Sequence, residues 1–162
     1  MKKKVFLGLA ILMLAAGGVF AQEKAKNTIA GGLDLGLFSG VSIDYERMLN
    51  DKFALGIEAG YDLAFFIIPD IFADVQVKWY PWAGKFYADL GAGYAQIFYV
   101  VPAIMITAGA GWKIDIGKPN GFILDLGAAI DYNIMLGSLS KNLVVSGPGI
   151  NARAKVQIGY SW

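Results

Sequence analysis

The sequence contains neither cysteine nor histidine, and only 17% of its 162 residues are charged. Without cysteine the chain can form no disulfide, no haem attachment motif and no thiolate nucleophile or metal cluster. Without histidine it has no Ser-His-Asp triad, no zinc-protease helix motif and no imidazole acid or base. A net charge of +1 without a basic run argues against nucleic-acid binding. Because 56% of the residues are hydrophobic, the chain is too apolar to be disordered, which leaves a membrane protein or a very apolar secreted barrel.

The first 21 residues have the three regions of a secretory signal peptide. Three lysines, Lys2 to Lys4, precede an uncharged stretch over residues 5–16, and Val19-Phe20-Ala21 offers a cleavage site before Gln22. A transmembrane anchor is the alternative, but the apolar stretch is short for that role and Gly17-Gly18 interrupts it. We therefore expect a signal peptide over residues 1–21 and a mature chain over residues 22–162. Export through the inner membrane follows from that expectation.

Apolar residues alternate with polar or small residues along the mature chain, and no long helical period is present. Eight segments show this alternation: residues 28–38, 41–47, 53–63, 71–79, 86–94, 104–116, 122–132 and 150–162. About 9–11 tilted residues span a bilayer as a β-strand, and an even number of half-apolar strands is typical of a closed membrane barrel. The pattern predicts an all-β fold, an eight-stranded antiparallel up-and-down transmembrane β-barrel.

The breaks between these segments also alternate. Short breaks, residues 50–52, 83–84 and 117–121, follow the even-numbered segments, whereas longer ones are expected around residues 66–70, 98–103 and 133–149. Short periplasmic turns and longer outer loops are the usual asymmetry of outer-membrane barrels. Aromatic residues gather at segment ends and predict two girdles: Phe53, Trp79, Trp82, Phe86, Tyr160 and Trp162 at the periplasmic rim, and Phe65, Phe66, Phe72, Phe98, Tyr99 and Tyr132 at the outer rim.

A transmembrane helix is the main rival interpretation. Residues 90–112 carry no charge and are long enough to cross a bilayer as a helix. However, Pro102 lies in the middle of this stretch among several glycines. The neighbouring segments carry acidic residues, each of which would cost about 2.5–3.5 kcal/mol at the centre of a membrane helix. We therefore favour strands.

With these features the chain resembles the small outer-membrane β-barrels of the OmpA/OmpX/OmpW-like and opacity types. The resemblance covers the whole mature chain and includes its end, Val156-Gln157-Ile158-Gly159-Tyr160-Ser161-Trp162. It implies location in the outer membrane, contact with the lipid bilayer, and assembly by periplasmic chaperones and a barrel-insertion machinery. Within that resemblance Tyr160 and Trp162 belong to the assembly signal, although a final Trp departs from the usual Phe.

Charged residues fall mostly on the face that the alternation turns away from lipid. The inward acids are Asp34, Asp44, Glu46, Glu58, Asp62, Asp74, Asp89, Asp115, Asp125 and Asp131, and the inward bases are Lys78, Lys113, Arg153 and Lys155. An eight-stranded barrel is just wide enough for side chains to fill. A packed charge network is therefore favoured over an open ion path.

The turns predict which inward charges face each other. A turn at residues 83–84 sets Lys78 opposite Asp89, and one at residues 117–121 sets Lys113 opposite Asp125, so we expect both as ion pairs between neighbouring strands. Asp44, Glu46 and Glu58 could instead hold a Ca²⁺ or Mg²⁺ ion. Neutralisation by Arg153 and Lys155 is the simpler explanation of these three carboxylates, and we predict no metal and no cofactor.

Two classes of function remain, and an enzyme is not among those favoured, because barrel enzymes of this size generally use a histidine. The favoured class is a non-enzymatic barrel with a mostly closed, charged lumen and a structural or surface-interaction role. The alternative is a narrow OmpW-like conduit for small apolar molecules. Residues 65–69 and 98–105 are apolar where loops are usually polar. We favour strands that continue through the outer leaflet there, and a rim for an apolar ligand or a surface partner is the alternative.

Overall fold

The computed structural model describes residues 27–36, 38–64, 68–82, 85–97, 101–116, 121–136 and 149–162. They form eight strands: β1 (Asn27–Gly36), β2 (Phe38–Met48), β3 (Phe53–Ala64), β4 (Ile68–Trp82), β5 (Phe86–Ile97), β6 (Val101–Ile116), β7 (Phe122–Met135) and β8 (Gly149–Ser161). All eight predicted strands are therefore present. The expected signal peptide, residues 1–21, lies outside the described residues and stays a prediction.

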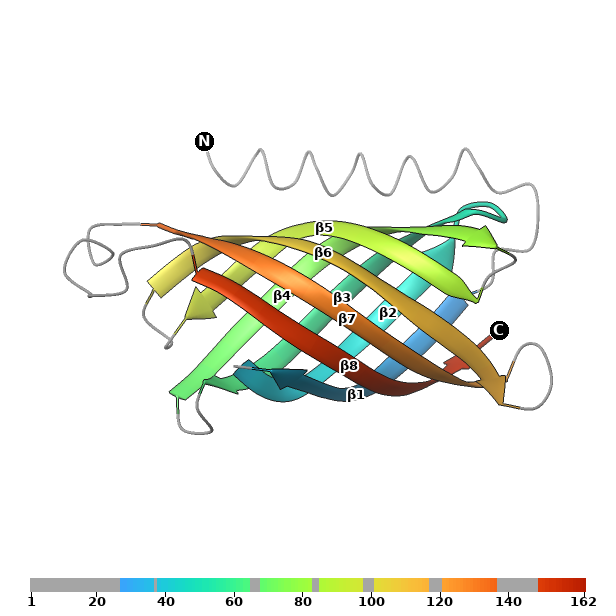
Figure 1. Ribbon diagram of the computed structural model, residues 1–162, viewed down its shortest axis with the longest axis horizontal. Coiled ribbons are helices and arrows are strands. Elements are labelled where there is room, and N and C mark those ends of the chain that lie inside the picture. Colours follow the sequence, from blue (N-terminus) through green and yellow to red (C-terminus); the bar gives the residue numbers. More distant parts are fainter. Residues whose placement is uncertain are drawn as a thin grey trace.

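Each strand pairs antiparallel with its neighbours in the sequence, and β1 pairs with β8 to close the barrel (Figure 1). The strands are tilted, as the register shows. A row of directly paired residues that starts at Ile123 on β7 passes once round the barrel and returns to β7 at Asn133. This stagger of ten residues is the shear that a closed barrel needs, because closure requires tilted strands. The predicted fold class is confirmed.

The alternation in the sequence becomes two different faces of the wall. Large apolar side chains such as Leu33, Val41, Ile57 and Ile130 are all more than half exposed on the outer face. Glu58 is fully buried on the inner face. Since an exposed apolar belt around a closed barrel matches the hydrocarbon core of a bilayer, the outer face is the lipid-facing one.

The rival interpretation of residues 90–112 as a helix is wrong, because their described part belongs to β5 and β6. A helix long and apolar enough to cross a membrane is not found among the described residues.

The two ends of the barrel differ, and we name them from their connections. The turn end holds both chain ends of the barrel, since the backbones of Asn27 and Trp162 exchange hydrogen bonds of 2.8 and 2.9 Å. It also holds the breaks after β2, β4 and β6. In the first of these, the Asn50 side chain accepts hydrogen bonds from the backbone N–H groups of Lys52 and Phe53. The opposite end is the loop end.

The expected difference in break length holds only in part. At the loop end, β3 and β4 are separated by residues 65–67 alone, and β5 and β6 by residues 98–100 alone. Only the break between β7 and β8, residues 136–148, is long. The prediction was wrong for the two shorter breaks because the strands continue further: β4 begins at Ile68 and β6 at Val101. Thus the apolar stretches near these positions lengthen strands, which was the favoured interpretation.

Aromatic residues ring the turn end. Phe53 lies opposite Trp79, and T-shaped ring contacts join Phe86 to Trp112 at 6.3 Å and Phe122 to Tyr160 at 5.6 Å. Towards the loop end a second ring of outward tyrosines occurs on alternate strands: Tyr61, Tyr94 and Tyr132. Two aromatic girdles, one near each end, are expected where a barrel meets the two membrane interfaces.

One predicted girdle residue is placed differently. Phe72 is only 8% exposed and points into the lumen, because it shares the inward parity of its neighbour Asp74 on β4. Its ring lies 4.6 Å from the guanidinium carbon of Arg153. The other girdle residues expected at this end, Phe65, Phe66, Phe98 and Tyr99, lie outside the described residues.

Candidate functional site

The chemically distinctive region of the barrel is its interior. Among the described residues, ten acidic side chains face the lumen in a buried or half-buried position, against four basic ones. The acids are Asp34, Asp44, Glu46, Glu58, Asp62, Asp70, Asp74, Asp89, Asp125 and Asp131, and the bases are Lys78, Lys113, Arg153 and Lys155. Asp115 shares the inward parity but is exposed at the turn end. All four bases occur where the sequence alternation predicted them.

Near the turn end, Glu46 is the centre of a network that joins three strands. The Lys113 ammonium on β6 donates to a Glu46 carboxylate oxygen at 2.7 Å, and the Lys78 ammonium on β4 lies 3.1 Å from the same oxygen. Lys78 also forms an ion pair with Asp44. The Tyr80 hydroxyl contacts both Glu46 oxygens at 2.7 and 2.8 Å. Glu46 is 2% exposed and Lys78 is 1% exposed, so the network is shielded from water.

The expected register is present, but the expected ion pairs are not. Lys78 lies directly opposite Asp89 and Lys113 directly opposite Asp125. At the turn Trp82 lies opposite Phe86, and a register shift of one residue between Trp79 and Trp82 then brings Lys78 opposite Asp89. The ammonium groups nevertheless contact β2, so the predicted pairings were wrong.

The physical reason is side-chain length in a narrow lumen. A lysine has a flexible four-carbon stem and can reach beyond the adjacent strand, whereas an aspartate cannot. The Asp89 carboxylate lies over Gly109 on β6, within 2.9 Å of where a Cβ on that glycine would stand. Asp125 accepts a hydrogen bond of 2.9 Å from the Tyr87 hydroxyl instead.

At mid-height, Glu58 binds two bases from β8. Its carboxylate lies 3.2 Å from Arg153 Nη1 and also pairs with the Lys155 ammonium. The Gln76 amide donates to Glu58 at 2.6 Å and to Asp74 at 3.0 Å. Arg153 further pairs with Asp131 at 3.0 Å and lies 3.6 Å from Asp34. Together these contacts connect β1, β3, β4, β7 and β8.

Glycines on the inner wall make room for the large side chains of this network. A Cβ on Gly111 would stand 2.4 Å from the Tyr87 ring, and one on Gly60 would stand 2.3 Å from the Phe72 ring. Sequence reasoning did not single out Tyr80, Tyr87, Gln76 or Thr107, all of which are buried and hydrogen-bonded in the lumen. The available signal was a large inward residue directly opposite an inward glycine, as with Tyr87 and Gly111.

Part of the lumen is apolar. Towards the loop end, inward side chains from β4, β5 and β6 pack into one cluster against Met135 of β7: Phe72, Ala95, Ile97, Val101, Ala103 and Met105. Polar side chains border this apolar lumen cluster, since Asp62 on β3, Asp131 on β7 and Asn151 on β8 also face the lumen. It breaks the polar-inside rule of larger barrels, as expected where side chains fill the interior.

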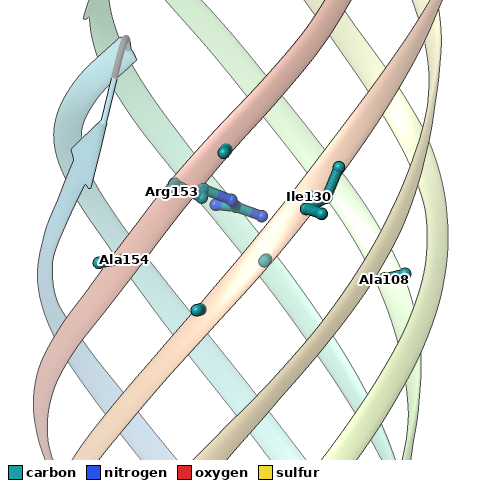
Figure 2. Close-up of a pocket in the computed structure, with 7 residues that line it drawn as sticks. Ala108, Ile130, Arg153 and Ala154 are labelled. Carbon is teal, nitrogen blue, oxygen red and sulfur yellow. The ribbon is translucent and has the colours of Figure 1, made fainter.

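A shallow hollow of about 400 Å³ lies on the outer face of β6, β7 and β8 (Figure 2). Its lining is mainly small: Ala108, Ala128, Ala129, Ile130, Ala152, Arg153 and Ala154. In Figure 2 Arg153 extends from β8 towards β7, and its guanidinium is held by Glu58 and Asp131. The hollow therefore offers an apolar lipid-facing surface without a free charged group.

The two residues of the expected assembly signal lie where the barrel closes. Tyr160 faces outwards between Phe122 and Trp162, the latter stacked on it at 6.4 Å. Trp162 exchanges backbone hydrogen bonds with Asn27. These residues therefore finish the seam between β8 and β1.

The three carboxylates considered as a metal site, Asp44, Glu46 and Glu58, accept contacts from Lys78, Lys113, Arg153 and Lys155. No group of three or more acidic side chains in the described part of the chain is arranged to hold a metal ion.

Solved structures share this fold. The N-terminal β-barrel domain of OprF from Pseudomonas aeruginosa matches with a TM-score of 0.57 and 12% identity, over 86% of this chain and 100% of that chain. A de novo designed transmembrane β-barrel matches at 0.50 and 13%, over 87% and 98%. The outer membrane protein OprG from Pseudomonas aeruginosa matches at 0.50 and 10%, over 86% and 97%. No family model and no curated protein sequence matches the chain.

These observations define the class of protein. The closed barrel, the apolar belt and the two aromatic girdles are those of a small eight-stranded outer-membrane β-barrel. The fold implies a location in the outer membrane.

Proposed function

We propose that this protein is a non-enzymatic outer-membrane barrel, closed by its own lumen charges, with a structural or surface-interaction role in the envelope. The observation that carries the proposal is the contact of 2.7 Å between Lys113 on β6 and Glu46 on β2. These strands are four apart in either direction round the barrel. The contact therefore spans the lumen at its full width.

Further contacts cross the lumen. Arg153 on β8 reaches Glu58 on β3, three strands away, at mid-height, and Tyr87 on β5 reaches Asp125 on β7 in the same layer as Lys113. An ion that crossed the barrel would have to break buried charge-assisted hydrogen bonds near the turn end and again at mid-height. Such bonds are strong in a low-dielectric interior, which favours a closed lumen.

Two features support a non-enzymatic role. The sequence contains no histidine or cysteine, and the lumen carboxylates at the centre of the networks accept hydrogen bonds from lysine, arginine, glutamine or tyrosine. Groups bound in this way are occupied and are not poised for proton transfer to a substrate. Assembly would depend on periplasmic chaperones and a barrel-insertion machinery, with Tyr160 and Trp162 in the recognised strand.

Conductance of the refolded protein in a planar bilayer tests the closed lumen. We expect silence from the wild type, and ion channels from a variant with Glu46→Ala, Lys113→Ala, Glu58→Ala and Arg153→Ala, which removes the contacts across the lumen at both levels. Slower gel migration after boiling must first show that both proteins are folded. Discrete, reproducible channels from the wild type would overturn the proposal.

One observation favours the second candidate, a narrow conduit for apolar molecules: the apolar lumen cluster at the loop end. Against it, the pairing of β5, β6 and β7 is continuous, so the described wall offers no sideways exit. Saturable binding of the apolar dye N-phenylnaphthylamine to the wild type, abolished by Met105→Gln, would overturn the closed-lumen role and support the conduit. Dye binding equal to that of empty micelles supports the closed barrel.

A further inference from the structure

A single hydroxyl group lies between two buried carboxyl groups at mid-height of the lumen. The Thr107 hydroxyl oxygen on β6 is 2.9 Å from Asp131 Oδ1 on β7 and 3.2 Å from Asp74 Oδ2 on β4. Thr107 is fully buried, and Asp74 and Asp131 are 2% and 3% exposed. A hydroxyl has one hydrogen and donates one full hydrogen bond. The second contact therefore needs a hydrogen from one of the two carboxyl groups.

The ion pairs indicate which carboxyl group carries that hydrogen. Asp131 forms an ion pair with the Arg153 guanidinium at 3.0 Å, so it accepts the Thr107 hydrogen as a carboxylate. Asp74, in contrast, lies within ion-pair distance of no lysine or arginine in the described part of the chain. The extra hydrogen therefore belongs to Asp74, which donates it to the Thr107 oxygen.

The groups that face Asp74 from the remaining strands leave it without a cation of its own. Glu58 lies directly opposite on β3, and Gly93 lies directly opposite on β5. Arg153 and Lys155 reach into the lumen from β8, but both of them contact Glu58. An ionised Asp74 would place a second negative charge opposite that of Glu58. Like charges directly opposite each other destabilise a pair of strands.

The Gln76 side chain also fits a neutral Asp74. Its amide nitrogen donates to Glu58 at 2.6 Å and to Asp74 Oδ1 at 3.0 Å, with Asp74 Oδ2 slightly farther at 3.2 Å. These two bonds use both amide hydrogens. Oδ1 is then the carbonyl oxygen of a carboxylic acid, and Oδ2 is its hydroxyl oxygen.

We propose that Asp74 is a carboxylic acid in the folded barrel in mildly acidic solution, and that its proton is a pH-sensitive lock between β4, β6 and β7. In this lock Asp74 donates to Thr107, which donates to Asp131. When the pH rises, the O–H bond of Asp74 breaks and the proton passes to hydroxide, which gives water. Thr107 can then bind only one of two carboxylates, and the link from β4 to β7 is lost.

The sign of the pH dependence follows from proton binding. An aspartate in the unfolded chain is already ionised at about pH 5, whereas folded Asp74 still holds its proton. Because the folded state binds one proton more, its stability falls as the pH rises. The folding equilibrium constant should fall by up to about tenfold per pH unit until the folded state also loses the proton.

Urea unfolding of the full barrel in micelles tests this lock at about pH 5 and about pH 8. Asp74→Asn imitates the acid, because an amide can donate to Thr107 and accept from Gln76. We expect it to match the wild type in the acidic buffer and to have the higher urea midpoint in the alkaline one. The matched control is Asp51→Asn in an exposed turn, which should follow the wild type at both pH values. The chain has no histidine that would titrate in this range.

Infrared spectra in an ester-free detergent detect the proton itself. In the acidic buffer the wild type should show the C=O stretch of a carboxylic acid that Asp74→Asn lacks, and this band should disappear in the alkaline buffer. Thr107→Val removes the acceptor and should shift the band to higher wavenumber.

Three results would overturn the lock. The first is a constant difference in midpoint between the wild type and Asp74→Asn at the two pH values. The second is an Asp74→Asn barrel that is clearly less stable in acid or does not fold, because the imitation of the acid would then have failed. The third is a carboxylic acid band in the wild type that is the same in Asp74→Asn or in Thr107→Val.

Discussion

A double-mutant cycle on Lys113 and Glu46 measures the contact that closes the lumen. Glu46→Gln keeps the shape of the side chain but removes its charge, and leaves Lys113 buried without a carboxylate partner. Lys113→Met keeps the stem and removes the ammonium. Glu46→Gln leaves the buried Lys113 ammonium without a carboxylate and should cost about 3–5 kcal/mol of unfolding free energy. Lys113→Met should cost less, because Glu46 keeps its ion pair with Lys78. The double variant should cost clearly less than the sum of the two.

The assay is urea unfolding in micelles, with a second cycle on Lys113 and Asp125 as the control. Asp125 lies directly opposite Lys113, but it accepts a hydrogen bond from the Tyr87 hydroxyl. We therefore expect a coupling of about 1.5–3 kcal/mol for Lys113 with Glu46, the range for hydrogen bonds to charged groups. The coupling with Asp125 should be less than half as large. A larger coupling with Asp125 would refute the account of how the lumen is closed, since the adjacent-strand pair would then be the real one.

Three further predictions concern folding. The protein should give a β-rich circular dichroism spectrum in micelles and migrate differently in gels before and after boiling, and a helical spectrum would contradict the barrel. Deleting Tyr160–Trp162 should lower the outer-membrane level severalfold in a fractionation assay, because it removes the last bonds of the β8–β1 seam; unchanged levels would argue against an assembly signal. Gly111→Ala should cost about 1–3 kcal/mol in urea unfolding by overpacking Tyr87, whereas Gly31→Ala, with no side chain nearby, should cost less.

The fold could be predicted from the sequence because one rule acts on every strand. A strand between lipid and a filled lumen must alternate apolar residues with polar or small ones. The sequence of each strand therefore shows by itself which side chains face lipid and which face the lumen. Register was predictable for Lys113 because its short turn fixes which residues meet. For Lys78 the predicted pairing is present because a register shift between Trp79 and Trp82 offsets a turn that is one residue longer than expected. Strand ends were less predictable. Apolar loop residues and apolar strand ends look alike, which is why the loop-end breaks at residues 65–67 and 98–100 are shorter than expected.

Ion-pair partners could not be predicted from register because lumen side chains can contact residues on strands across the barrel as well as residues on the adjacent strand. Register compares only adjacent strands, and there the short Asp89 and Asp125 were the natural partners of the lysines. In a closed barrel of eight strands, residues from β2 and β6 share the same interior, and a lysine stem bridges the remaining gap. Glycines at positions 109 and 111 let the short acids and tyrosines settle against the wall, which leaves the centre of the lumen to the lysines and to Glu46. The pairing therefore depends on the side-chain volumes of strands far apart in the sequence, and these were not part of the register argument.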